Sequence, residues 1–357
     1  MERIVETKVW HVDKNVEHLE TCSQVVDAAR FIREGELVAF PTETVYGLGA
    51  NAFSGEAVAK IYLAKGRPSD NPLIVHIGEM AQIHDVCSEV PELALPLLER
   101  FWPGPLTILL PKAERIATQV TRLDTVGVRM PDHPLALALI RAAGVPIAAP
   151  SANRSGRPSP TTAEHVRQDL DGRIAAILDG GETGVGVEST VLDLTVSPPM
   201  ILRPGGITRE QLLEVLDEVA IDPAFEAKSE VPRSPGMKYT HYAPRGELWL
   251  VEGKAAEVRK KMEQLIRAAK AQGFSTGVMA TEETIAFWKQ SPDVDVVLNC
   301  GRRQDPSSIA QHLYACLRQF DERGVQYIVG ETFPRSGMGM AVMNRLEKAA
   351  SGRILSV

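Results

Sequence analysis

The stretch that decides the fold is FPTETVYGLGANAFSGEAVAKIYLAKGRPSDNPLIVHI, residues 40–77. It begins at the end of a short apolar strand, continues through a turn rich in threonine and glycine, and then forms one amphipathic helix. Lys65 and Arg67 follow that helix directly, and a second strand, residues 73–77, carries His76 near its end. Two cations beside a proline-restricted turn favour an anion such as phosphate, because arginine offers a planar fork and lysine a compact charge.

The composition predicts a soluble, two-domain globular protein. The chain has 357 residues, more than one ordinary core accommodates, of which 44% are hydrophobic and 24% charged. A formal net charge of −7 argues against broad, non-specific nucleic-acid binding, which requires a basic face. The four cysteines are scattered and the eight histidines do not pair at metal-ligand spacing. We therefore expect reduced thiols and no tightly held, protein-ligated metal.

The sequence lacks the segments typical of export or membrane insertion. MERIVETKVW, residues 1–10, has no basic segment followed by an apolar run. The apolar-looking segment 95–110 is interrupted by charged residues and prolines, and no uninterrupted apolar run is long enough to cross a bilayer. We therefore expect a cytoplasmic protein that does not bind a membrane.

The order of the predicted elements divides the chain into two α/β domains joined by a linker. Over residues 1–221 strands outnumber helices and several follow one another directly, which predicts a twisted mixed sheet with flanking helices. Residues 222–245 lose their periodicity and repeat prolines, which indicates a linker. Over residues 246–357 strands and helices alternate, which predicts a smaller, Rossmann-like parallel α/β domain.

Familiar nucleotide and hydrolase motifs are absent or weak. GLGANA, residues 47–52, fits the G-x-G-x-x-A pattern of dinucleotide sites, but a turn separates its glycines from the preceding strand. No acidic residue closes a second strand at the expected spacing. The sequence contains neither a P-loop nor a G-x-S-x-G elbow. A nicotinamide or flavin cofactor and serine hydrolysis are therefore not predicted.

Cationic and small polar residues gather at the predicted strand ends. They are Pro41-Thr42-Glu43-Thr44, Lys65-Gly66-Arg67, Arg129, Ser151-Ala152-Asn153, Ser189 and Arg203. Ligands of α/β sheets bind outside such ends, and this mixture of groups suits a polyphosphate and a small polar zwitterion. Each residue alone is explained about as well as a turn former or a surface ion pair, and it is their combination that favours a site.

Seven motifs in unbroken order then resemble the Sua5/YrdC/YwlC family, the threonylcarbamoyl-AMP synthases. Between residues 4 and 219 they are PTETVYGLG, KGRPSDNPLIVHI, WPGPLT, VGVRMPDHP, APSANRSGRPSPT, GVEST and RPG. SPGMKYTHYAP, residues 234–244, and the α/β tail resemble the linker and C-terminal Sua5 domain of the longer family members. The tail matches mainly through PRSGMGMAVMNRLEKA. The resemblance implies a YrdC-like N-terminal sheet.

The activity implied by this resemblance is a condensation that uses ATP. The family joins L-threonine, bicarbonate and ATP, with Mg²⁺ expected alongside the nucleotide, into threonylcarbamoyl-adenylate and releases pyrophosphate. Downstream transfer proteins use the adenylate to make the threonylcarbamoyladenosine (t6A37) of transfer RNA, and we expect no strong direct tRNA binding by this chain. Two alternatives stay open, an RNA-binding module and an enzyme that transfers a carbamoyl group to a protein. The oligomeric state and the role of the C-terminal domain also stay open.

The same resemblance assigns roles to individual residues. The catalytic tetrad is Lys65, Arg67, Ser151 and Asn153. The ATP positions are Arg67, Asn71, Thr125, Ser151, Ser159, Arg203 and Tyr239. The threonine pocket is Thr44, His76, Arg129, Ala149 through its backbone, and Ser189. Because Tyr239 lies in the linker, we expect the linker to cover the nucleotide like a lid. The order of carbamate formation and adenylation, and any general base, stay open.

Overall fold

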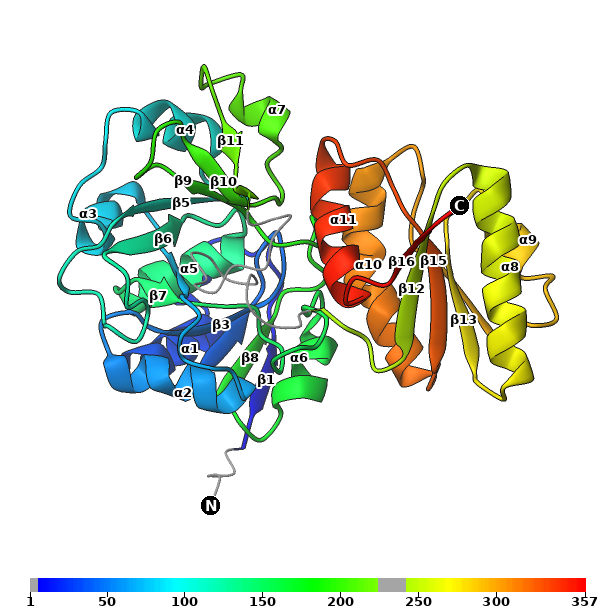
Figure 1. The fold of residues 1–357 in the computed structure, drawn as a ribbon. Coiled ribbons are helices and arrows are strands. Elements are labelled where there is room, and N and C mark those ends of the chain that lie inside the picture. Colours follow the sequence, from blue (N-terminus) through cyan, green and yellow to red (C-terminus); the bar gives the residue numbers. More distant parts are fainter. Residues whose placement is uncertain (1–5, 224–241) are drawn as a thin grey trace. The chain divides into compact units, whose positions relative to one another are not determined.

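The computed structural model describes residues 6–223 and 242–357, which form two compact units (Figure 1). The first unit holds residues 6–155 and 159–223. The second holds residues 156–158 and 242–357. The predicted domain boundaries at residues 221 and 246 stay a prediction.

An eleven-stranded mixed sheet organises the first unit, in the order β1-β8-β2-β3-β7-β4-β6-β5-β9-β10-β11. Its strands are β1 (Lys8–His11), β2 (Val38–Phe40), β3 (Gly47–Asn51), β4 (Ile74–His76), β5 (Leu106–Pro111), β6 (Thr125–Arg129), β7 (Ile147–Ala148), β8 (Ala176–Asp179), β9 (Thr190–Asp193), β10 (Met200–Arg203) and β11 (Ala220–Ile221). Parallel and antiparallel pairs alternate irregularly, so the predicted mixed sheet is confirmed.

The helices of the first unit follow their sequence signals. They are α1 (Ser23–Arg33), α2 (Gly55–Lys65), α3 (Ile83–Val86), α4 (Ala94–Phe101), α5 (Pro134–Ala143), α6 (Ala163–Leu170) and α7 (Arg209–Leu212). The Ser54 hydroxyl caps the start of α2, and Gly66, with φ at 61°, ends it directly after Lys65. The apolar spacing of residues 23–34 predicts that Val26 faces the core, and the cap at Thr208 predicts a helix over residues 208–219. Both expectations are wrong: Val26 of α1 is exposed, and α7 is much shorter.

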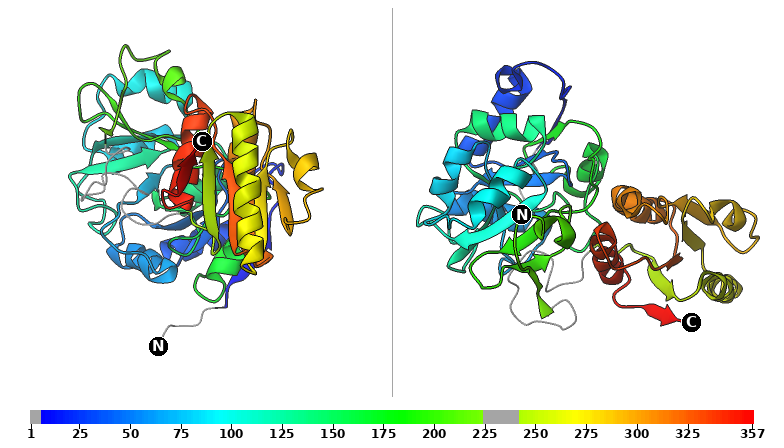
Figure 2. Two further views of the ribbon diagram at one scale, coloured as in Figure 1. Left: turned by 45° about the vertical axis from the view of Figure 1, so that its right-hand side comes forward. Right: turned by 90° about the horizontal axis from the view of Figure 1, so that it is seen from above.

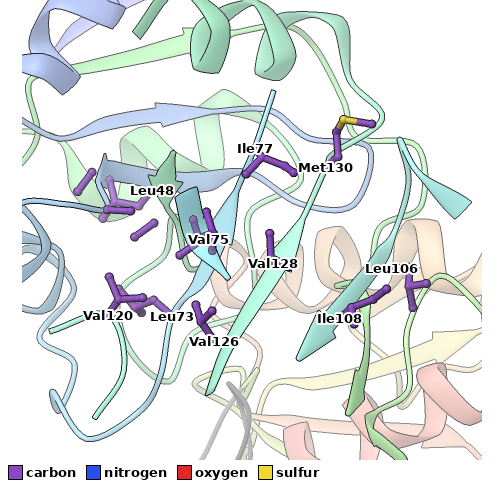
Figure 3. Close-up of a cluster of buried hydrophobic side chains, with 14 of the residues drawn as sticks. Leu48, Leu73, Val75, Ile77, Leu106, Ile108, Val120, Val126, Val128 and Met130 are labelled. Carbon is purple, nitrogen blue, oxygen red and sulfur yellow. The ribbon is translucent and has the colours of Figure 1, made fainter. Parts of the chain in front are cut away.

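Two apolar cores cover opposite faces of this sheet. Along β2, Leu37 and Ala39 belong to one core, whereas Val38 and Phe40 belong to the other. Since successive strand residues point to opposite faces, this alternation places the two cores on the two sides. The first core includes side chains of β3, β4, β5 and β6 (Figure 3). In the second core, α1 packs against α5.

Strand β3 corrects the prediction that the glycines after the polar turn are part of a connection. It pairs antiparallel with β2, with Phe40 opposite Gly47. A Cβ atom on Gly49 would lie 2.8 Å from the Ile147 side chain and 2.9 Å from the Phe40 ring. Gly49 is therefore required because neighbouring side chains approach the backbone closely, and it does not mark a turn here.

A five-stranded, all-parallel sheet forms the second unit, in the order β14-β13-β15-β12-β16. Its strands are β12 (Glu247–Glu252), β13 (Thr276–Ala280), β14 (Val296–Asn299), β15 (Tyr327–Glu331) and β16 (Ile354–Ser356). The helices are α8 (Ala255–Ala271), α9 (Ile285–Trp288), α10 (Pro306–Glu322) and α11 (Met338–Ala349). Helices α8 and α9 cover one face, and α10 and α11 cover the other (Figures 1 and 2).

This arrangement confirms the predicted parallel α/β pattern of the second unit. The final strand β16 was not predicted. None of the helices within residues 6–223 and 242–357 combines the length and apolar character that crossing a membrane requires.

Candidate active site

Lys65 is the centre of the first group of predicted site residues. Its buried ammonium group donates to the backbone carbonyl of Ser151, to the Asn153 carbonyl at 2.6 Å and to the Asn153 side-chain oxygen at 3.4 Å. The Ser151 hydroxyl donates to the same side-chain oxygen at 2.5 Å. The Ser151–Asn153 loop is itself fixed, because the Ala152 N–H donates to the Tyr46 carbonyl. Three members of the predicted tetrad therefore meet in space.

Arg67, the fourth member, lines a cavity with a second arginine. The cavity has a volume of about 740 Å³, and its lining includes Arg67, Arg122, Tyr62 and the loop that follows α2. Burial raises the pKa of Tyr62 to about 12, and the charges of both arginines oppose that rise, so both guanidinium groups lie near the phenol. A pair of cations in a cavity of this size suits a polyanion.

Asn71 is a buried residue whose side chain makes no hydrogen bond within residues 6–223 and 242–357. Its backbone carbonyl accepts from Arg67 and Tyr62, each at 3.4 Å. The amide oxygen and nitrogen of its side chain make no hydrogen bond with any described residue. Buried amides are almost always satisfied in folded proteins, so this side chain can accept and donate hydrogen bonds that the described residues do not supply.

Arg129 is the centre of the second group, at the end of β6. The register of β4 and β6 places it beside His76. Its guanidinium donates to the Gly104 carbonyl at 3.1 Å through Nε and to the Thr44 hydroxyl at 3.1 Å through Nη1. Its Nη2 lies 2.6 Å from a carboxylate oxygen of Glu43. The side chain is 4% exposed and is held from three sides.

His76 is a neutral imidazole in this environment. Burial, reinforced by the charge of Arg129, lowers its pKa to about 3. Its Nδ1 atom makes no hydrogen bond with any part of the described chain. A neutral ring with one unpartnered nitrogen can contact a polar ligand without adding charge.

Ser189 and Arg203 form a third group with a residue the sequence did not single out. Arg203 donates to the Ser189 carbonyl through Nε and to its hydroxyl through Nη2, both at 3.1 Å. The Ser189 hydroxyl also lies 2.8 Å from the hydroxyl of Thr107. Ser159, another predicted ATP residue, is fully buried and donates to a Glu188 carboxylate oxygen at 2.6 Å.

The remaining predicted residues are less informative. Thr125 opens β6, and the Ala149 N–H donates to the Ile74 carbonyl, two residues before His76. Thr125 begins β6 and Arg129 ends it, so the predicted site residues lie at both ends of a strand. A simple α/β arrangement would instead place them all along one edge of the sheet. Tyr239 and most of the predicted linker lie outside the described residues.

Four neighbours of these groups were not assigned roles from sequence: Glu43, Thr107, Arg122 and Glu188. Glu43 belongs to PTETVYGLG and Glu188 to GVEST, so both lay inside quoted motifs. Thr107 is the last residue of WPGPLT and so also lay inside a quoted motif. Arg122 gave no such signal, because a loop arginine is common in any fold. In residues 6–223 and 242–357, no three His, Cys, Asp or Glu side chains are grouped to hold a metal ion.

The second unit carries one comparable group at the carboxyl ends of its strands. Glu331, the last residue of β15, is buried and forms an ion pair with Arg303. The Thr281 hydroxyl, just after β13, lies 3.5 Å from the other Glu331 oxygen. Parallel sheets often bind ligands at this position. Here the buried carboxylate is compensated by the protein.

Two protein families match consecutive parts of the chain. The family described as "Telomere recombination", which joins Sua5, YciO and YrdC, matches residues 30–205. The family described as "Threonylcarbamoyl-AMP synthase, C-terminal domain" matches residues 207–351.

Relatives match nearly the whole length. A threonylcarbamoyl-AMP synthase of Bacillus subtilis is 53% identical over 98% of this chain and 100% of its own length. One of Pyrococcus abyssi is 52% identical over 92% and 95%. A solved structure of P. abyssi Sua5 complexed with L-threonine has a TM-score of 0.91 and 49% identity, and covers 98% of this chain and 100% of that one. The chain belongs to the Sua5/YrdC/YwlC family, as its motifs predict.

Proposed function

We propose that this chain is an L-threonylcarbamoyl-adenylate synthase, which condenses L-threonine, bicarbonate and ATP and releases pyrophosphate. The observation that carries the proposal is the position of the unpartnered buried groups. The side-chain amide of Asn71 and the Nδ1 atom of His76 lack hydrogen-bond partners among the described residues. Family resemblance assigns these two residues to ATP and to threonine. Membership of a family whose relatives bear this name over their full length supports the same activity.

The Lys65 group would act at the phosphates. Lys65 and Arg67 neutralise charge on the triphosphate, while Ser151 and Asn153 orient it. A carbamate oxygen attacks the α-phosphorus, the bond from that phosphorus to the bridging oxygen breaks, and pyrophosphate leaves with the electron pair. Such a step requires positioning and charge neutralisation more than a covalent nucleophile. Arg122, in the same cavity as Arg67, is a further cation for the leaving phosphates.

The remaining ATP contacts would come from strands and loops around the same sheet. In our proposal, Asn71, Thr125, Ser159 and Arg203 bind the nucleotide. Asn71 does so through its unpartnered amide, and Arg203 through a buried guanidinium held by Ser189. The substrate form is MgATP, with the metal held largely by phosphates and water.

The Arg129 group would bind threonine. The guanidinium pairs with the substrate carboxylate, for which its planar fork is well suited. Thr44, Ser189 and the backbone of Ala149 provide polar contacts, and neutral His76 presents Nδ1. The threonine amine then attacks bicarbonate carbon, and loss of water gives the carbamate. Proteins that modify transfer RNA would consume the adenylate in the cytoplasm.

The test is an omission series with the full chain. Threonylcarbamoyl-adenylate and pyrophosphate are measured with all three substrates and again with threonine, bicarbonate or ATP left out. We expect both products only in the complete mixture. Equal release of AMP and pyrophosphate without threonine would contradict the assignment.

A further inference from the structure

Glu43 is a buried acid beside the proposed threonine site, and the mechanism above gives it no role. It lies in the turn between β2 and β3, and its side chain is only 12% exposed. The turn is fixed, because the Val185 N–H donates to the Glu43 carbonyl at 2.7 Å and the Gly186 N–H donates to the Thr44 carbonyl at 3.2 Å. The carboxylate is therefore held in place and is not a mobile surface charge.

The contacts of this carboxylate are incomplete. One oxygen lies 2.6 Å from Arg129 Nη2. That contact is not aligned as a hydrogen bond, and neither oxygen has a hydrogen-bond partner among the described residues. A buried carboxylate can accept several hydrogen bonds, and leaving them unmade is unfavourable. Glu43 thus has unused acceptor capacity directly beside the proposed carboxylate-binding residue.

A zwitterionic amino acid matches this pair of charges. Its ammonium and carboxylate groups are attached to one carbon, so a carboxylate bound at Arg129 brings the ammonium close to whatever anion shares that guanidinium. Here that anion is Glu43. Nearby, burial and then the Glu43 charge raise the pKa of Asp132, whereas the Arg129 charge opposes that rise, so Asp132 lies within the field of both members of the pair.

We propose that Glu43 binds the ammonium group of threonine while Arg129 binds its carboxylate. The inference rests on the proposed function and adds a specificity determinant to it. A buried Glu–Arg pair is neutral overall, so a neutral zwitterion compensates both charges. A simple carboxylate or a 2-hydroxy acid compensates only Arg129 and leaves the Glu43 charge unmatched.

The test measures binding to the full-length protein by calorimetry, with two probes. L-Threonine carries the ammonium, and (2S,3R)-2,3-dihydroxybutyrate replaces it with a hydroxyl but keeps the carboxylate. We expect the wild type to prefer threonine. Glu43→Gln, which keeps shape and removes charge, should weaken threonine binding at least tenfold and leave dihydroxybutyrate binding equal or tighter. Glu43→Asp should recover part of the preference, and Glu182→Gln, which changes an exposed glutamate of the same unit, should change neither affinity.

The direction in which Glu43→Gln changes the affinity for threonine separates the competing explanations. If Glu43 merely competes with the substrate for Arg129, Glu43→Gln will tighten threonine binding, and the inference is overturned. An equal loss for both probes would indicate a structural role and would overturn it too. If Glu43→Gln fails to fold, Glu43→Asp decides, because an unchanged preference in that variant contradicts ammonium binding. Failure of the wild type to bind threonine would instead count against the proposed function.

Discussion

Two groups of buried polar side chains, one in each unit, differ in how completely they are paired. At the strand ends of the second unit, Glu331 is compensated by Arg303 and contacted by Thr281. In the first unit, the side-chain amide of Asn71 and the Nδ1 atom of His76 have no hydrogen-bond partner among the described residues. Both units are α/β structures with polar residues beyond their strands. What distinguishes the candidate site is therefore the incomplete pairing of its polar groups and not their presence.

This difference has an energetic meaning. Leaving a buried polar group unsatisfied destabilises a protein by about 1–3 kcal/mol. Sequences do not keep such groups for stability, and functional sites are where they persist. A ligand that completes their hydrogen bonds recovers that free energy on binding. We therefore expect substrates to complete the pairing of Asn71 and of His76 Nδ1, whereas the Glu331 carboxylate is already paired within the folded chain.

The largest expected effect is on turnover. Lys65→Met keeps the aliphatic stem and removes the ammonium group, so we expect kcat/KM for adenylate formation to fall about 1,000-fold. Lys270→Met removes an exposed lysine of the second unit that pairs with Asp295, and kcat/KM should stay within twofold. Steady-state kinetics would check both, with thermal unfolding as the folding control. Near wild-type turnover of Lys65→Met would contradict the phosphate role.

The second expected effect is on stability alone. Glu331→Gln breaks the compensated group of the second sheet, so we expect the free energy of unfolding to fall by about 2–3 kcal/mol. Turnover per folded molecule should not change. Glu252→Gln removes one partner of an exposed pair with Arg335 and should have an effect below about 0.5 kcal/mol. A loss of turnover in Glu331→Gln at full folding would show that the second sheet is not merely structural.

The third prediction uses the pH dependence of His76. Its pKa is about 3 in the folded chain against an ordinary 6.5, so between these values the unfolded chain binds more protons. The contribution of neutral His76 to the free energy of unfolding is therefore fully present above about pH 6.5 and is lost progressively as the pH falls below that value. Between pH 7 and 5 this residue accounts for a loss on the order of 2 kcal/mol.

Chemical denaturation at both pH values would check this. His76→Asn should lose less stability on acidification than the wild type by that amount. His133, whose pKa burial lowers to about 4, contributes equally in both proteins. His312→Asn, on the surface of the second unit, serves as the control and should behave like the wild type. Identical acid sensitivity of His76→Asn and the wild type would show that the ring is not buried as a neutral group.

The smallest expected effect is that of Asn71→Leu on the KM for ATP and on the free energy of unfolding. Asn71→Leu replaces an unsatisfied amide with an apolar group of similar shape, so the free energy of unfolding should stay unchanged or rise. The KM for ATP should rise about tenfold, because one hydrogen-bonding group is lost. A variant that is both less stable and unaltered toward ATP would place the Asn71 amide in the fold and not in the site.

Much of the fold could be predicted from sequence because its elements have strong local signals. Local patterns predict a helix over residues 23–34 and strands over 200–203 and 276–280, and α1, β10 and β13 lie at or within one residue of these bounds, since periodicity and stop signals are local properties. Strand β3 was misread because Gly49 is required by Phe40 and Ile147, which are distant in sequence. Short α7 and the added β16 likewise depend on packing and pairing that no local pattern encodes.

The candidate site could be predicted only where a motif carried it. Lys65, Ser151 and Asn153 were grouped by family resemblance, and their hydrogen bonds agree with that grouping. The pairing of Glu43 with Arg129 brings together two segments that are 86 residues apart in the sequence. Such a contact has no sequence signal, so the role inferred for Glu43 became visible only in the folded chain.

One measurement tests the central claim most directly: a crystal structure of the full chain with L-threonine and a non-hydrolysable ATP analogue. The account predicts ligand atoms within hydrogen-bonding distance of the Asn71 amide and His76 Nδ1, with the threonine carboxylate on Arg129. The network around Glu331 should keep its pairing. Ligands bound elsewhere, with Asn71 and His76 still lacking partners, would contradict it.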